Sequence, residues 1–71
     1  MGNIFGIKLG KKVKELRGKL VITQDKLAEL IATSYKYLQR IEGKNPPDIR
    51  LSTIIRLAKA LKVKPAELLK F

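Results

Sequence analysis

Four polar side chains recur at helical spacing between residues 35 and 40: Tyr35, Lys36, Gln39 and Arg40. Residues spaced in this way share one side of an α-helix, so the four would point in one direction. Lys36 and Arg40 can donate to O6 and N7 of guanine, and Gln39 can pair bidentately with adenine. Tyr35 can contact a thymine methyl group or donate to a phosphate. This face therefore suits contacts to the base edges of duplex DNA, although each side chain taken alone could equally be a solvated surface residue.

The elements that must position these four residues are two short helices between Gln24 and Gly43. Apolar residues recur at i, i+1 and i+4 in two separate runs, as on a helix with one buried face. Five residues separate the runs and the first three of them form the turn, which leaves room for a tight turn and nothing more. The runs are Leu27, Ala28 and Ile31, then Tyr37, Leu38 and Ile41, with Ala32, Thr33 and Ser34 as the turn. We assign Tyr37 to packing.

Both helices have marked starts, because Thr23 and Ser34 stand immediately before the two runs. A hydroxyl there can accept from the free backbone N–H groups of the first turn. Ala28 is small enough to let the second helix cross closely at a steep angle, with Leu38 and Ile41 filling the space beneath. The pair is a helix-turn-helix. Many all-α proteins that never touch DNA contain such a pair, so spacing alone leaves both interpretations open.

Length and composition exclude most other functions. The chain has 71 residues, which we interpret as one domain over residues 1–71 with residues 1–7 as an N-terminal arm. It has no cysteine and no histidine, which removes disulfides, thiolate nucleophiles and the commonest metal ligands and acid-base groups. Its six carboxylates are scattered along helical positions with no catalytic pairing. We expect no enzyme activity, no cofactor and no metal.

The formal charge of +10 favours a polyanionic partner. Residues 1–22 carry six cations and one anion, residues 23–45 carry four and three, and residues 46–71 carry six and two. The surplus thus flanks the helix pair, as expected if the flanks hold phosphates while the middle recognises something more specific. The alternative is that lysines merely keep helix faces soluble, or indicate a heat-adapted source.

The chain before the helix pair predicts one more helix, from about Lys8 to Lys19, with Leu9, Val13 and Leu16 on its inner face. Its polar face is rich in lysine. Arg17 lies near the end of this helix and close to the apolar stripe, where an unpaired cation would be costly, so it needs an anion.

The first seven residues are apolar and contain glycine, but they are too short for a signal peptide or a transmembrane span. We expect Ile4, Phe5 and Ile7 to cover an edge of the core or to add to a subunit contact.

After Gly43, two adjacent prolines stop the second helix of the pair. A fourth helix follows over residues 51–61, and a short fifth begins at Pro65, a residue suited to the first helical position. The apolar chain end either closes the core or meets a second copy of the chain. The fourth helix has a predicted inner stripe of Leu51, Ile54, Ile55, Ala58 and Leu61, and the chain end carries Leu68, Leu69 and Phe71.

The segment TQDKLAELIATSYKYLQRIEGK resembles the helix-turn-helix signature of phage repressor and Cro-type regulators, the XRE-like family. The flanks resemble it as well: KKVKELR is similar to the family's first helix and LSTIIRLAKALKVKPAELL to its fourth and fifth. The resemblance covers roughly residues 8 to 70. It implies an all-α, compact five-helix fold of the lambda-repressor type. The residues that match are Thr23, Gln24, Leu27, Ala28, Ser34, Leu38, Ile41 and Glu42.

The resemblance also implies several roles for single residues. In some members an arginine at the place of Arg17 pairs with the glutamate that corresponds to Glu42. The family usually has glycine in the turn where this chain has Ala32, and alanine in a left-handed conformation costs about 1 kcal/mol. Gln24 matches a glutamine that clamps the phosphate backbone and supports the groove-bound helix, and Arg50 lies where related repressors approach the minor groove.

Phosphate contacts should therefore come from Gln24, Ser34, Lys44 and Arg50. Ser34 precedes the groove-bound helix and Lys44 directly follows it, although Ser34 serving only as an N-cap is an equal alternative. These four should set affinity and its salt dependence, whereas base contacts by Tyr35, Lys36, Gln39 and Arg40 should set sequence preference.

We predict a DNA-binding transcription regulator, a repressor acting at a palindromic operator as a homodimer through the fifth helix and the chain ends. It should be cytoplasmic and associated with the nucleoid. A competing hypothesis is an antitoxin or adaptor that uses the same fold to bind a partner protein such as a toxin or antirepressor. Binding to an anionic membrane ranks third, and we predict no membrane partner. RNA binding is disfavoured because no aromatic platform for stacked bases is visible.

Overall fold

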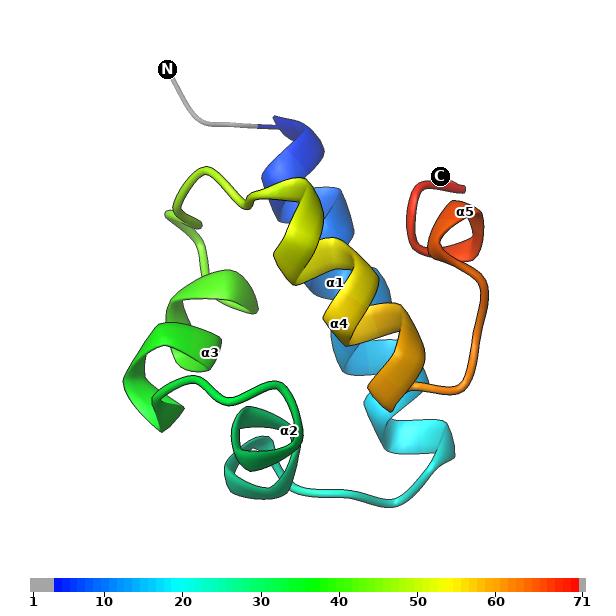
Figure 1. Cartoon of the computed structure of the whole chain (residues 1–71). Coiled ribbons are helices and arrows are strands. Elements are labelled where there is room, and N and C mark those ends of the chain that lie inside the picture. Colours follow the sequence, from blue (N-terminus) through cyan, green and yellow to red (C-terminus); the bar gives the residue numbers. More distant parts are fainter. Residues whose placement is uncertain (1–3, 71) are drawn as a thin grey trace.

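The computed structural model describes residues 4–70, and all regular structure within them is helical (Figure 1). The elements are α1 (Ile4–Lys19), α2 (Gln24–Leu30), α3 (Tyr35–Ile41), α4 (Leu51–Ala60) and α5 (Pro65–Leu68). This confirms the all-α, five-helix prediction. Residues 1–3 and 71, which belong to the expected arm and chain end, lie outside the described residues.

One hydrophobic core joins the helices, and α1 contacts both α3 and α5. In Figure 1, α3 lies on one side of the molecule and α5 on the other, with α1 and α4 between them. The side chains predicted for the inner face of the helix pair are buried, and Tyr37 packs against this core as assigned. The core residues are Leu9, Val13, Leu16, Leu27, Ala28, Ile31, Leu38, Ile41, Leu57, Ala58, Leu61 and Leu68.

The first helix begins at Ile4 rather than near Lys8, so four residues assigned to the N-terminal arm are helical. The buried stripe extends back through Gly6 and continues through Leu9 and Gly10. Glycine is unfavourable in a free helix, but here both glycines face the protein interior, and packing outweighs the local preference. Residues 4–7 of the expected N-terminal arm thus form the first turn of α1.

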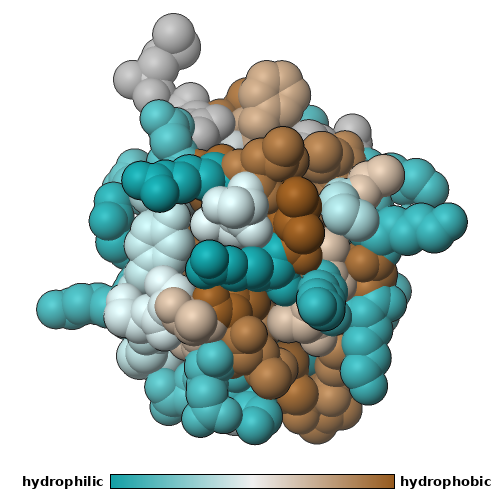
Figure 2. Space-filling view, in the orientation of Figure 1, coloured by the Kyte–Doolittle hydropathy of each residue, from teal (hydrophilic) through white to brown (hydrophobic). Residues whose placement is uncertain are grey.

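The buried face of α4 is rotated from the predicted one. Leu57, Ala58 and Leu61 are buried, whereas Leu51 and Ile55 keep 68% and 48% of their surface exposed. Apolar residues occupy more of the helix circumference than the rest of so short a chain can cover. Hydrophobic residues consequently gather at the surface over α4 (Figure 2).

Three helices end in the same backbone motif, with a non-glycine residue in the left-handed region: Val21 (φ 54°), Ala32 (φ 56°) and Lys62 (φ 61°). After α2, the N–H of Thr33 bonds to the carbonyl of Ala28 at 2.9 Å, which closes a Schellman turn. Ala32 thus adopts the left-handed conformation at the place where the family usually has glycine. The other two positions were not anticipated from the sequence.

Replacing Ala32 by glycine should stabilise the fold by about 0.5 to 1 kcal/mol, because glycine adopts a positive φ without the Cβ clash. The free energy of unfolding from urea titration measures the change. As a control, Ala60→Gly, at a helical position of α4, should destabilise by about 1 kcal/mol. A loss of stability on changing Ala32 would contradict the strain argument.

Candidate nucleic-acid interface

The two helices of the pair begin at side-chain caps. Thr23 Oγ1 accepts from the backbone N–H of Lys26 at 3.1 Å, and Ser34 Oγ accepts from that of Tyr37 at 3.0 Å. Each cap satisfies one of the free donors in the first turn. The predicted starts of α2 and α3 are confirmed, and they fix which side chains of α3 point outward.

The outward face of α3 carries the four residues predicted to contact bases. Lys36, Gln39 and Arg40 are exposed and Tyr35 is 44% exposed, whereas Leu38 on the opposite side is completely buried. The structure therefore brings all four together at the surface. Their contacts with bases remain a prediction.

Two of these residues are already hydrogen-bonded to each other, since Gln39 Nε2 donates to Tyr35 Oη at 3.1 Å. Pairing with adenine needs one N–H and the carbonyl oxygen of the amide. Gln39 keeps both, because its nitrogen carries a second hydrogen. The bond limits the rotamers of Gln39, which lowers the entropy lost when the side chain engages a base edge.

Glu42, directly after α3, is the centre of a hydrogen-bond network that holds this helix in place. Its carboxylate is only 2% exposed and accepts from Nε and Nη2 of Arg17 at 3.0 and 3.1 Å. Arg17 also donates through Nη1 to the carbonyl of Ile22 at 2.9 Å. This confirms the ion pair inferred from the family resemblance and gives Arg17 the anion it needs.

Gln24 adds a third bond to the same carboxylate, donating from Nε2 to Oε1 of Glu42 at 2.9 Å. The network thus ties the end of α3 to the end of α1 and the start of α2. Gln24 retains one amide hydrogen for a phosphate, so its phosphate contact stays a prediction. Its bond to Glu42 was not anticipated, because nothing local in the sequence pairs residues that far apart.

The remaining phosphate candidates lie around α3. The Ser34 hydroxyl accepts as a cap and still has its own hydrogen to donate. Lys44 and Arg50 are exposed, one in the turn after α3 and the other at the N-cap position of α4. Their phosphate contacts also stay predictions.

In the part of the chain that the structure describes, no carboxylate pairs with the cations near α3. Within residues 4–70, the ion pairs engage Lys12, Arg17, Lys19, Lys26 and Lys70, and none engages Lys36, Arg40, Lys44 or Arg50. An exposed surface with several unpaired cations attracts a polyanion, since phosphate binding releases counterions without first breaking an ion pair.

Gly10 allows α1 to approach the end of α3 closely, and this role was not predicted from the sequence. A Cβ at this position would collide with the carbonyl oxygen of Ile41 and would lie 3.2 Å from Cα of Glu42. The backbone of α1 therefore passes directly against the end of α3. A glycine inside an otherwise regular helix was the available signal, since such residues often mark close approach.

The described part of the chain contains no group of three or more acidic side chains that could hold a metal ion. None of the helices between residues 4 and 70 has the length and apolar character needed to cross a bilayer.

Comparisons with known proteins agree with this geometry. A family model described as a helix-turn-helix domain matches residues 10–70. The restriction-modification controller protein C.AhdI from Aeromonas hydrophila has a crystal structure similar to this chain, with a TM-score of 0.82 and 32% sequence identity. The match covers 89% of this chain and 94% of that one. The curated proteins gave no match.

Proposed function

Because the chain belongs to the XRE-type helix-turn-helix family of DNA-binding transcription regulators, which are not enzymes, we propose that it represses transcription by occupying a palindromic operator as a homodimer. In this proposal α3 enters the major groove and Tyr35, Lys36, Gln39 and Arg40 contact base edges. A regulator of this kind works at the nucleoid, inside the cytoplasm.

The observation that carries the proposal is that α3 has an exposed, basic outward face and is held in a fixed orientation. Its outward face is exposed, and no carboxylate among residues 4–70 pairs with its two cations. Glu42 at its end is hydrogen-bonded to Arg17 and Gln24. A helix held in a fixed orientation loses little entropy on entering a groove. Lys44 and Arg50 lie on the segments that follow α3, where they suit phosphate contacts that set the register of the helix on the duplex.

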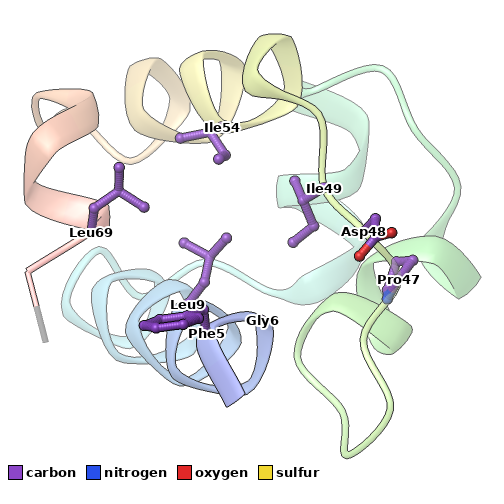
Figure 3. Close-up of a pocket in the computed structure, with 8 residues that line it drawn as sticks. All are labelled: Phe5, Gly6, Leu9, Pro47, Asp48, Ile49, Ile54 and Leu69. Carbon is purple, nitrogen blue, oxygen red and sulfur yellow. The ribbon is translucent and has the colours of Figure 1, made fainter. Parts of the chain in front are cut away.

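The homodimer is supported by apolar surface near α5. A groove of about 340 Å³ lies between the start of α1, the segment before α4 and the end of α5, and Phe5 and Leu69 at its rim are 69% and 51% exposed (Figure 3). A second copy would cover this surface. One short helix contacts few base pairs, whereas two helices about 34 to 36 Å apart contact a palindrome and multiply specificity.

Selection of bound sequences from a random duplex pool tests the proposal. We expect a palindromic consensus, and Lys36→Ala or Arg40→Ala should lose about 1 to 3 kcal/mol of discrimination at one position of each half-site. Arg56→Ala, which removes an exposed cation of α4, is the control and should leave the consensus unchanged. Uniformly weaker binding with the same consensus would make Lys36 and Arg40 phosphate contacts, and a consensus without symmetry would argue against the homodimer.

A second candidate function, binding of a partner protein by an antitoxin or adaptor, is favoured by the exposed Leu51 and Ile55 on α4. Soluble monomers seldom leave adjacent large apolar residues uncovered without use. Stoichiometric co-purification with one partner, lost in Leu51→Ser/Ile55→Ser, would support it. Operator binding unaffected by that pair of changes, with no partner retained, would support the simple regulator.

A further inference from the structure

A second basic surface lies between α1 and α5. Lys8, Lys11, Lys12 and Lys70 line a depression of about 260 Å³ together with Glu15. We call these four lysines the α1–α5 basic cluster. They account for a quarter of the 16 cations of the chain, and none of them is among the eight residues named above for contacts with bases or phosphates.

The cluster lies on the side of α1 that faces away from α3. Gly10 marks the line where α1 touches α3, through Ile41. Lys8 and Lys12 are each two residues from Gly10, which places them roughly 160° around the helix from it. Lys12 points instead to Glu67 of α5, 3.9 Å away. In Figure 1 the body of α1 lies between α3 and α5, so Lys12 and Lys70 lie on another side of the molecule from α3.

The carboxylates among residues 4–70 only partly balance Lys11, Lys12 and Lys70. Glu67 is shared by Lys12 at 3.9 Å and Lys70 at 3.6 Å, and Lys70 remains 72% exposed. Glu15 is 3.5 Å from Lys19, at the next turn of the helix. The pairs of Glu15 with Lys19 and of Glu67 with Lys70 are exposed, and exposed pairs contribute little and are easily exchanged. Within residues 4–70, Lys11, Lys12, Lys19 and Lys70 therefore face two carboxylates, which leaves an excess of two positive charges without counting Lys8.

The shape of this surface suits an extended polyanion. Its lysines run along α1 from Lys8 to Lys19, about 16 Å at 1.5 Å per residue. Over the same length of the B-DNA helix axis, one strand presents roughly five phosphates, at 3.4 Å of axis each. The residues that line the depression include no aromatic ring on which a single-stranded base could stack.

We propose that the α1–α5 basic cluster binds the phosphate backbone of a second DNA duplex, so that a molecule seated on its operator through α3 joins two duplexes. The second contact is independent of sequence, because flexible ammonium groups recognise phosphates as point charges. The proposal rests on the proposed function for the first duplex only.

A capture experiment tests it with two readouts. Operator duplex is fixed to beads and saturated with protein. A labelled duplex of equal length without the operator is then added at about 50 mM salt. The protein retained on the beads and the labelled duplex captured by it are measured separately. We expect Lys11→Glu/Lys70→Glu to lower the label captured per retained protein about tenfold or more, since log affinity falls with each lost phosphate contact. Arg56→Glu/Lys59→Glu makes the same change in net charge on α4 and should capture nearly as much as the unaltered chain.

The outcomes separate the two proposals. Failure to retain protein on operator duplex overturns the proposed function. Retention without capture, or equal loss in both charge-reversal pairs, overturns the second contact. If a dimer bridged the duplexes through its two α3 helices, capture of the labelled duplex would not depend on Lys11 and Lys70. Light scattering checks that both charge-reversal variants keep the molecular mass of the unaltered protein. Poly-glutamate and unlabelled duplex are also compared, at equal charge, as competitors for the labelled duplex. Equal competition would overturn the DNA contact and indicate an acidic polypeptide as the partner of the cluster.

A further arm tests the cluster even where the operator is not retained. In Lys36→Ala/Arg40→Ala, which removes the two cations of α3, residual binding to duplex without the operator should fall about tenfold when Lys11→Glu and Lys70→Glu are added. No further loss would overturn the cluster as a DNA contact.

Discussion

Glu42→Ala is expected to destabilise the protein by about 3 kcal/mol, because it leaves the guanidinium of Arg17 in a nearly buried place without its anion. Arg17 is 16% exposed and the carboxylate that it loses is 2% exposed, so water replaces little of the interaction. Gln24 loses its acceptor at the same time. In a domain of this size the change corresponds to a fall in Tm of roughly 12 °C or more.

Circular dichroism during urea and thermal unfolding measures this loss. Glu29→Ala is the control, since its ion pair with Lys26 is exposed at both ends, and its effect should stay within about 0.5 kcal/mol. Arg17→Met combined with Glu42→Met removes both charges together and should cost less than Glu42→Ala alone. Equal effects of Glu29→Ala and Glu42→Ala would show that the network does not hold α3 in place.

Gly10→Ala is expected to destabilise the protein by about 2 kcal/mol, because the added methyl group meets backbone rather than a movable side chain. To make room, α1 must shift away from Ile41 or α3 must tilt. Operator affinity should fall as well at temperatures where the variant is folded, since α3 carries the proposed base contacts.

Gly18→Ala provides a matched control in the same helix, because a Cβ at Gly18 has nothing within 4 Å. There the substitution should stabilise by up to about 1 kcal/mol, as expected for alanine over glycine in a helix. Opposite signs in the two unfolding free energies are the expected result. A stabilising Gly10→Ala would show that α1 and α3 are not in close backbone contact.

Local patterns in the sequence were sufficient for much of this interface. Thr23 and Ser34 start helices through hydrogen bonds made within three residues. The caps can therefore be predicted from the sequence without any tertiary contact. Helical periodicity alone placed Lys36 and Arg40 on the side opposite Leu38. The left-handed Ala32 and the pairing of Arg17 with Glu42 came from the family resemblance, which carries long-range information that one sequence lacks.

Tertiary structure alone decided the remaining features. A sequence pattern shows which residues of a helix share a face, but burial depends on what the other helices cover, and this short chain covers only one side of α4. Leu51 and Ile55 are exposed for that reason. The roles of Gly10 and of the Gln24 amide depend on contacts between residues at least 18 positions apart in the sequence. Such contacts arise when helices dock, and no local propensity encodes them.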